Sequence, residues 1–408
     1  MNVSGPARVT HASTRAAVLD LIRAAGMISR VGLVNASGLT GGTISTVVRG
    51  LIDEGLVAET GHAESTGGKR RVMLQLNHFA RYAIGVHLDD ARITYVLTNL
   101  GGAVVARISR AGAASEEPAA VVARMTREVG ALIDSVGVDR DRILGLGLVS
   151  ARPSEFGLEL ERATGLPVVL DNDATAAAIG EHWSGGVGAT ATFAALYMGS
   201  DIGAGVVLGG TTHRGPSGHA GEIGHACLDL DGPPCRCGAR GCLEVLAGPA
   251  AVVARAREDR ALTRAAGLVG GRTRPATPVA TDFAAISRAA RQGNARALAL
   301  LERSARYVAA AARTLANALD LEVLVLTGPS FAIAGSIYLP VLREELDRAF
   351  VARGAHPVSV RLSPSAASAA AIGAAAIVLQ SELVPRTQGL RLPDDLAADE
   401  PPVFQHAR

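Results

Sequence analysis

The stretch that decides the fold runs from His225 to Glu244 and reads HACLDLDGPPCRCGARGCLE. It offers one imidazole and three closely spaced thiols, from His225, Cys235, Cys237 and Cys242. One nitrogen and three thiolate ligands complete a tetrahedral zinc site with no open position, which predicts a structural ion rather than a catalytic one. Glycines at positions 238 and 241 allow the short loop to turn back on the ion. The alternative is three buried or redox-linked thiols beside an unrelated histidine.

Two carboxylates flank this ligand set. Glu222 lies just before it and Glu244 just after it. A zinc ion held between them would fix both side chains in space and so present two hydrogen-bond acceptors to a ligand rich in hydroxyl groups. The loop is therefore interpreted as the floor of a ligand site. Cys227 lies outside the pattern and is predicted to be a small core residue.

The composition fits an intracellular protein of two or three domains. The chain has 408 residues, of which 48% are hydrophobic, and a formal net charge of +2 that identifies no partner. It shows no basic-then-apolar leader, no uncharged apolar run long enough to span a bilayer and no disulfide framework. We therefore expect a cytoplasmic address and no membrane partner.

Residues 14–77 have the pattern of three short helices followed by a hairpin. A second helix is expected over residues 31–36, after Ser29 as its cap, and a turn at Gly38. The first helix precedes it, with one apolar face made by residues at spacings of three and four: Val18, Leu21, Ile22 and Ala25.

The third helix is predicted to begin after Thr40 as its cap. The outward face carries Gly42, Thr46 and Arg49, with Thr43 on the flank. Helix, turn and helix at this spacing form a DNA-reading geometry, in which Thr40, Thr43, Thr46 and Arg49 are the candidate contacts. The alternative is a three-helix module that mediates protein contacts. The buried stripe of this helix comprises Ile44, Val47, Val48, Leu51 and Ile52.

Two further features of this module favour DNA. The glycine pair at positions 41 and 42 weakens the third helix by about 1 kcal/mol per residue relative to alanine, which is understandable if a phosphate approaches the backbone closely. Two strand-like runs surround the sequence STGGKRR at residues 65–71 and predict a winged hairpin. Its tip residues Lys69, Arg70 and Arg71 would neutralise backbone phosphates without choosing a sequence.

From about residue 80 the chain alternates strands and helices, which predicts an α/β fold with two lobes and a cleft. Residues from about 385 onward, rich in Pro and Asp, are expected to form a disordered tail. The expected strands are residues 81–88, 92–99, 144–149, 168–170, 193–198, 205–208 and 323–326. The expected helices are residues 174–183, one or two over 285–319, and 366–379.

These stretches resemble the ROK family (repressors, open reading frames and sugar kinases) in its transcriptional-regulator branch. The matching segments are SRVGLVNASGLTGGTISTVVRGLIDEGLVAETG, STGGKRR, LPVVLDNDATAAAIGE, SGHAGEIGHACLDLDG and CRCGARGCLE. The resemblance implies an N-terminal winged helix-turn-helix plus an α/β two-lobed, actin-like (ribonuclease H-like) ROK domain. The implied domains are residues 1–78 (DNA binding), 79–182 with 360–382 (small lobe), 183–359 (large lobe with the zinc loop) and 383–408 (tail).

The resemblance also implies the residues of the site. Zinc would be held by His225, Cys235, Cys237 and Cys242, and a sugar by Asn172, Asp173, Glu222, His225 and Glu244. Asp173 matches the general base of the kinase branch, which takes a proton from the sugar hydroxyl that attacks ATP.

The two phosphate loops depart from the kinase pattern. The family's Asp followed by Gly-Gly-Thr corresponds here to His87, Asp89, Asp90 and Ala91, and the second loop, Gly-Thr-Gly-Ile-Gly, to residues 199–203 with Asp201. Three carboxylates thus lie where backbone amides should surround phosphate, and like charges a few ångströms apart repel by about 4 kcal/mol per pair at an effective dielectric near 20. No catalytic residue is therefore expected to act. The acidic pair as a cation site is an alternative.

A second departure concerns the sugar. Only ARPSEFGLELERATGLPVVLD connects the strand GLGLVS to the NDA motif, roughly half the family's spacing. Some sugar contacts must be missing or supplied from elsewhere, so the cleft either binds a sugar or sugar derivative, such as a sugar phosphate, or is degenerate.

These observations favour a DNA-binding transcriptional regulator, most simply a repressor of carbohydrate genes, with structural zinc, double-stranded operator DNA and a sugar or sugar-phosphate effector as partners. Near-palindromic operators imply a homodimer or homotetramer. The rival is an ATP-dependent sugar kinase with an attached DNA-binding module, and a third interpretation is constitutive repression with a vestigial cleft.

Overall fold

The computed structural model describes residues 11–62, 71–113, 116–150, 156–184, 187–188, 191–268 and 277–383. Unit 1 comprises residues 1–82, 99–103 and 379–408, and unit 2 comprises residues 83–98 and 104–378. The wing tip with Lys69 and Arg70, and the tail predicted from residue 383, lie outside the described residues, except that Leu383 ends a helix. The predicted domain boundaries remain a prediction.

Unit 1 begins with three helices, α1 (His11–Ala25), α2 (Arg30–Ser37) and α3 (Gly41–Asp53). Each start and stop has a local cause. Ser29 Oγ accepts the Gly32 amide at 3.1 Å and caps α2, and Gly38 ends it with a φ of 68° that favours glycine. Thr40 Oγ1 accepts the Thr43 amide at 3.2 Å and caps α3. The predicted helix-turn-helix is present.

The core of unit 1 forms where α1 and α3 meet. The predicted stripes are buried at Val18, Leu21 and Ile22 in α1 and at Ile44, Val47, Val48 and Leu51 in α3. Two predicted members differ. Ala25 is exposed because it lies in the last turn of α1, where the helix leaves the core, and Ile52 is only half-buried near the end of α3.

A three-stranded sheet completes unit 1. Strands β2 (Val57–His62) and β3 (Val72–Leu76) pair antiparallel as the predicted hairpin, and β1 (Met27–Ser29), which was not predicted, adds to the other side of β3. The Arg30 guanidinium contacts the Glu59 carboxylate at 2.7 Å and ties α2 to β2. This ion pair therefore attaches the β2–β3 hairpin, the predicted wing, to α2.

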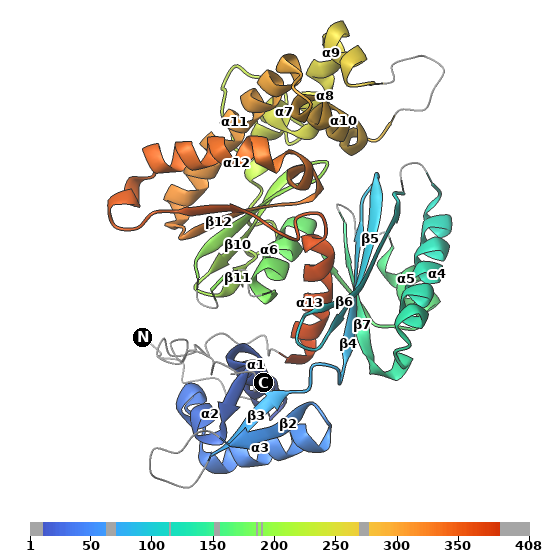
Figure 1. Cartoon of the computed structure of the whole chain (residues 1–408), viewed down its shortest axis with the longest axis vertical. Coiled ribbons are helices and arrows are strands. Elements are labelled where there is room, and N and C mark those ends of the chain that lie inside the picture. Colours follow the sequence, from blue (N-terminus) through green and yellow to red (C-terminus); the bar gives the residue numbers. More distant parts are fainter. Residues whose placement is uncertain are drawn as a thin grey trace, which may run out of the picture. The chain divides into compact units, whose positions relative to one another are not determined.

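Unit 2 contains a first five-stranded sheet, ordered β6-β5-β4-β7-β8. Its strands are β4 (Tyr82–Leu88), β5 (Arg92–Asn99), β6 (Val104–Ala111), β7 (Ile143–Val149) and β8 (Val168–Asp171). Helices α4 (Pro118–Val136) and α5 (Gly157–Thr164) pack together on one face, while the red helix α13 lies on the other (Figure 1). Strand β6 was not predicted, since its exposed Val104 and Val105 give no apolar alternation.

A second five-stranded sheet is ordered β11-β10-β9-β12-β13. Its strands are β9 (Phe193–Met198), β10 (Ile202–Leu208), β11 (Thr211–His213), β12 (Val323–Thr327) and β13 (Ser359–Leu362). The predicted strand at 205–208 thus begins three residues earlier, directly after a tight turn. The β9–β10 turn, like the β4–β5 turn of the first sheet, is a hairpin.

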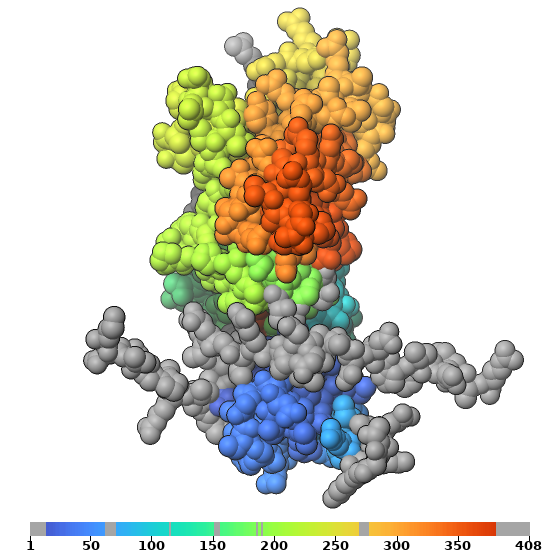
Figure 2. All heavy atoms as spheres, turned by 90° about the vertical axis from the view of Figure 1, so that its left-hand side faces the viewer, coloured from blue at the N-terminus to red at the C-terminus, as the bar shows by residue number. Residues whose placement is uncertain are grey.

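Six helices described between residues 243 and 349 cover the second sheet. They are α7 (Leu243–Ala247), α8 (Pro249–Glu258), α9 (Arg260–Ala265), α10 (Val279–Arg291), α11 (Ala295–Leu319) and α12 (Pro329–Ala349). In the space-filling view the helices from residue 250 onward, yellow to orange, form one continuous block (Figure 2). Phe283, Phe331 and Tyr338 are fully buried at its centre.

Two central helices join the sheets of unit 2, α6 (Asp173–Trp183) and α13 (Ala369–Leu383). Their backbones are in direct contact, with no room for a side chain between them. A Cβ on Gly373 of α13 would lie 1.6 Å from the Ala176 carbonyl oxygen of α6, and one on Gly147 of β7 would lie 2.0 Å from the Ala374 carbonyl oxygen. On its far side α6 approaches β10, where a Cβ on Gly205 would lie 2.3 Å from the Ala174 carbonyl oxygen. The glycines are therefore required by packing.

Within the described ranges no single helix is both long and apolar enough to cross a membrane. Only α2 with α3 passes that test as a pair, with a bend of 119° between the two helices.

The glycine contacts give a stability prediction. Replacing Gly373 by Ala should lower the free energy of unfolding by about 3 kcal/mol, because the added methyl group meets backbone that has no room to move. Gly130→Ala, within α4, is the matched control. A Cβ there meets nothing within 4 Å among the described residues, so stability should hold or rise by about 0.5–1 kcal/mol. Denaturant unfolding of both variants measures the difference, and equal midpoints would contradict the packing argument.

Candidate functional site

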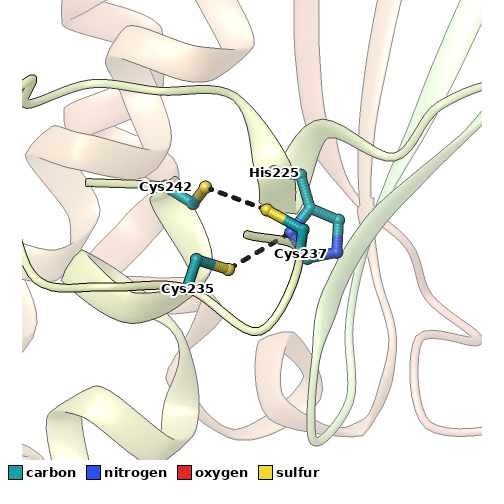
Figure 3. Close-up of side chains that lie close together, drawn as sticks. All are labelled: His225, Cys235, Cys237 and Cys242. Atoms are coloured by element: carbon teal, nitrogen blue, oxygen red, sulfur yellow. Dashed lines mark hydrogen bonds between the residues drawn. The ribbon is translucent and has the colours of Figure 1, made fainter. Parts of the chain in front are cut away.

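The four predicted zinc ligands converge at the start of α7. Ligand atoms of His225, Cys235, Cys237 and Cys242 all lie within 4.8 Å of one another (Figure 3). The Cys237 and Cys242 sulfurs are 3.6 Å apart, and Cys235 Sγ lies 3.5 Å from His225 Nδ1. Zinc–sulfur bonds of about 2.3 Å in a tetrahedron separate two sulfurs by roughly 3.8 Å. The side chains are therefore spaced as the edges of a tetrahedral site.

Backbone hydrogen bonds build the loop that carries these ligands. The Cys235 amide donates to the Ala239 carbonyl at 2.8 Å, and the Gly241 amide donates to the Pro233 carbonyl at 2.9 Å. Gly241 has a φ of 59°, and a Cβ there would lie 1.6 Å from the Asp229 carbonyl oxygen. Cys242 then forms the N-cap position of α7. Local turns, rather than distant packing, hold the thiols together.

The electrostatics of the thiols suit a metal. Burial raises the pKa of the Cys242 thiol to about 12, whereas the Ala239 amide lowers the pKa of Cys237. Three thiols this close together, two of them buried, are stable as thiolates only with a cation at their centre, because like charges repel. The donor set, with no open position, fits an ion that stabilises the loop and performs no chemistry of its own.

The prediction for Cys227 is wrong. Its side chain is exposed, in the short segment between His225 and Cys235, and its backbone forms an isolated antiparallel bridge to Cys242. It is not part of the four-residue cluster.

Asn172 and Asp173 begin α6. Asn172 caps the helix by accepting the Thr175 amide at 2.8 Å, and Asp173 Oδ1 accepts the Ala174 amide at 3.0 Å. Burial raises the pKa of Asp173 above its usual value, and the nearby imidazole of His87 opposes that rise. Asp173 thus keeps its second carboxylate oxygen as an acceptor for a ligand, whereas the single side-chain oxygen of Asn172 is used by the helix cap and its Nδ2 amide remains as a donor.

Glu244 lies on α7, two residues after the last thiol. Its Oε2 accepts the Ile202 amide at 2.8 Å, which joins α7 to the start of β10. Burial raises the pKa of Glu244 to about 7, and the neighbouring charge of Glu222 contributes to the rise. Glu222 itself is exposed, directly before the turn that carries His225. The structure thus brings the two carboxylates near each other, with Glu244 the more deeply placed.

Sequence reasoning missed the residue that supports this region, Arg214. Its guanidinium donates two parallel hydrogen bonds to the Asp171 carboxylate, at 2.8 and 2.6 Å. Asp171 ends β8 directly before Asn172, and Arg214 follows β11 at the start of the loop leading to Glu222. The Asp side chain is 6% exposed, which makes the bidentate pair an effective clamp between the two halves of the site.

The two turns that match the phosphate loops are hydrogen-bonded to each other and within themselves through side chains. The Ser200 hydroxyl donates to Asp89 Oδ2 at 3.1 Å, and the Ala91 amide donates to Asp89 Oδ1 at 2.8 Å. The exposed Asp201 pairs with Arg236 of the zinc loop at 3.1 Å. The turn amide of Ala91 therefore bonds a carboxylate of the same chain.

Behind these turns lies a buried pair, His87 and Tyr197. His87 Nε2 is 3.1 Å from the Tyr197 hydroxyl, and the rings meet edge to face with centroids 6.2 Å apart. Burial, and then the charge of Asp173, raise the pKa of Tyr197 well above its usual value. The imidazole thus occupies the position of the family's acid with a neutral partner beside it.

The DNA-reading candidates lie on one helix. Gly42, Thr46 and Arg49 are exposed on α3, and Thr43 is half-buried. The Thr40 and Thr43 hydroxyls are hydrogen-bonded to each other at 2.8 Å, so Thr40 acts as a cap and its hydroxyl is already engaged. Arg71 is exposed directly before β3, whereas Lys69 and Arg70 lie outside the described residues.

A family model described as "ROK family" matches residues 141–381. The chain belongs to the ROK family. Its fold, a winged helix-turn-helix module followed by two α/β sheets with central helices, is the one predicted from the sequence.

Individual relatives follow. A putative xylose repressor from a Caldicellulosiruptor species is 29% identical over 382 residues, covering 87% of this chain and 92% of the relative. A glucokinase from Thermotoga maritima is 33% identical over 225 residues, covering 54% of this chain and 68% of the relative. A crystal structure titled as a ROK family transcriptional regulator, homologous to the E. coli MLC protein, superposes with a TM-score of 0.69 at 24% identity. It covers 91% of this chain and 97% of that chain.

The cysteine cluster yields a metal prediction. Cys235→Ser should reduce bound zinc from one equivalent per chain to well below one, and should lower the free energy of unfolding by roughly 3–5 kcal/mol because a structural ion is lost. Cys227→Ser is the matched control and should retain both the zinc and the stability. Elemental analysis with denaturant unfolding measures the pair. Full zinc content in the Cys235 variant would exclude this ligand set.

Proposed function

We propose that this protein is a transcriptional repressor that binds operator DNA through unit 1 and a sugar through the ROK domain, with no kinase activity. The observation that carries the proposal is the pairing of an exposed reading helix, α3, with phosphate turns that are closed by Asp89, Ser200 and Asp201.

The DNA part rests on the geometry of unit 1. The α2–α3 pair presents Thr46 and Arg49 to solvent, while Arg71 lies at the base of the wing. In a helix-turn-helix the exposed side chains of the second helix reach base edges, and basic wing residues bind the backbone. Since operators for such modules are near-palindromic, a homodimer or homotetramer is the expected assembly.

The sugar part rests on acceptors at the two ends of the site. Asn172 and Asp173 open α6, and Glu222 and Glu244 flank the zinc loop, with the Arg214–Asp171 pair between them. Sugars are bound in proteins by hydroxyls that donate to carboxylate and amide oxygens. The relative named a xylose repressor favours D-xylose as the first compound to test, with D-glucose second.

Zinc is assigned a supporting role. The ion would be held by His225, Cys235, Cys237 and Cys242, with no position open for substrate. His225 and the segment that follows it connect directly to Glu222 and Glu244 in sequence, so the metal would set the relative position of these two carboxylates.

The absence of kinase activity is argued from charge. A nucleotide brings three or four negative charges to the turns, where Asp89 and Asp90 already lie on one hairpin and Asp201 on the other. Phosphate binding there needs free backbone amides, and the Ala91 amide is bonded to Asp89. ATP could bind there only if the Ala91 amide released the Asp89 carboxylate.

A second candidate is an ATP-dependent sugar kinase. It is favoured by Asp173, which begins α6 with a raised pKa as a general base requires, and by the relative named a glucokinase. Incubation with ATP, Mg²⁺ and a panel of hexoses, pentoses and N-acetylhexosamines tests it. Sugar phosphate whose formation is lost in Asp173→Asn would establish the kinase and remove the proposal of an inactive site.

The DNA-binding prediction concerns Arg49. Full-length protein should protect a site in DNA upstream of its own gene, with affinity falling steeply as salt rises because counterions are released. Arg49→Ala should weaken binding about tenfold or more, the loss of one base-reading side chain. Arg303→Ala, an exposed residue of α11 outside unit 1, should bind as the unaltered protein does. If Arg49→Ala protected the same DNA site with unchanged affinity, α3 would not be the helix that reads the bases.

The effector prediction concerns Glu244. A bound sugar should raise the melting temperature by mass action, by an amount equivalent to about 2.7 kcal/mol at one hundred times the dissociation constant. Glu244→Gln should abolish that shift and leave DNA affinity unchanged, and Glu222→Gln should do the same. Glu258→Gln, exposed on α8, is the control. Thermal shifts of equal size in all variants would place the sugar elsewhere, and no shift for any sugar would indicate constitutive repression.

A further inference from the structure

Unit 1 has a recess beside the first two turns of α3. Its volume is about 310 Å³, and it is lined by Thr14, Gly42, Thr43, Thr46 and Val47. Val47 is 5% exposed, and Thr14 of α1 is 8% exposed, whereas Gly42 and Thr46 are exposed. The recess thus has a buried floor, formed by Val47 and Thr14, and an open mouth on α3.

The mouth lies on the face of α3 that carries Arg49. Gly42, Thr46 and Arg49 occur at positions i, i+4 and i+7, and at 100° per residue they fall within an arc of about 60°. An object that contacts Arg49 and Thr46 along the helix therefore also meets the recess at Gly42.

Gly42 is not required by the fold. It is not among the residues with positive φ, and among the described residues a Cβ built on it meets nothing closer than Thr40 Oγ1 at 4.0 Å. A glycine within the first turn of a helix weakens that helix, so its lack of a side chain serves a contact outside the chain. This contrasts with Gly373 and Gly147, where backbone atoms of the same chain fill the space.

The chemistry of this face is unusual for base reading. It carries one cation, Arg49, and no amide side chain, its one carboxylate, Asp53, lies eleven residues beyond Gly42 at the far end of α3, and the Thr43 hydroxyl is already bonded to Thr40 at 2.8 Å. Arg49 can donate to a guanine. The surface near the recess combines the hydroxyls of Thr14 and Thr46 with the methyl groups of Thr46 and Val47. These methyl groups match the only apolar group at the floor of the major groove, the 5-methyl group of thymine.

We propose that the recess beside Gly42 seats the 5-methyl group of one thymine in each operator half-site. The proposal rests on the DNA-binding function proposed above. It assigns Gly42, Thr46 and Val47 as the residues that specify this base pair, with Gly42 acting by leaving space for the methyl group.

The test begins with selection of duplexes by the full-length protein from a random pool. Each thymine of the selected sequence is then replaced in turn by deoxyuridine, which removes the methyl group and leaves every hydrogen bond of the base pair in place. One position in each half-site should lose about fourfold in affinity, equivalent to ~0.8 kcal/mol for one methyl-sized group removed from water. Other thymines should change affinity less than twofold.

Two variants locate the effect. Gly42→Ala places a methyl group in the recess, so its affinity for the thymine duplex should fall to that for the deoxyuridine duplex, and the ratio between them should approach one. Its thermal stability should be equal or higher, because no described residue of unit 1 obstructs the Cβ. Gly50→Ala is the matched control. It lies in the same helix with nothing within 4 Å, does not line the recess, and should retain the fourfold ratio.

The outcomes separate the two proposals. If the pool yields no enriched sequence, the DNA-binding function fails and this inference fails with it. If a sequence is enriched but no thymine shows a ratio above twofold, or the ratio persists in Gly42→Ala, the protein remains a DNA-binding regulator and the recess does not read thymine.

Discussion

The structure of unit 2 depends on how closely the backbones of α6 and α13 approach each other. Gly373 allows α13 to rest on the Ala176 carbonyl, Gly147 allows the first sheet to rest on α13, and Gly205 allows β10 to rest on α6. A side chain at any of these positions would move one sheet relative to the other. The N-terminus of α6, with Asn172 and Asp173, is fixed by the same contacts, so the ligand oxygens take their position from the packing of the core.

The β9–β10 turn is the point where the parts of the site meet. Its Ile202 amide holds Glu244, its Asp201 carboxylate pairs with Arg236 between two zinc ligands, and its Ser200 hydroxyl bonds Asp89 of the other sheet. In a kinase of this fold such turns serve the nucleotide. Here the Ser200 hydroxyl and the Ala91 and Ile202 amides are bonded within the chain, and the Ser200–Asp89 bond joins the two sheets.

Much of this could be predicted from the sequence, and the reasons differ by residue. The convergence of His225 and the three cysteines was predicted because all four lie within eighteen residues and depend on local turns. The α3 stripe followed from helical spacing. The Arg214–Asp171 clamp could not be found, since the partners are 43 residues apart and Arg214 belongs to no pattern. Strands β1 and β6 give no clear apolar alternation and are defined by their pairing with a neighbouring strand. The exposure of Cys227 has no signal in the local sequence.

The closed turns have a physiological consequence for the proposed regulator. A sugar kinase must bind two ligands, the sugar and a nucleotide, before it can act. In this chain the hydrogen bond between Ser200 and Asp89 holds the two turns together without a nucleotide. If the proposed regulator binds a sugar and no nucleotide, the fraction of protein with bound sugar follows the sugar concentration alone. Its target genes would then respond to nutrient supply in starved and energised cells alike.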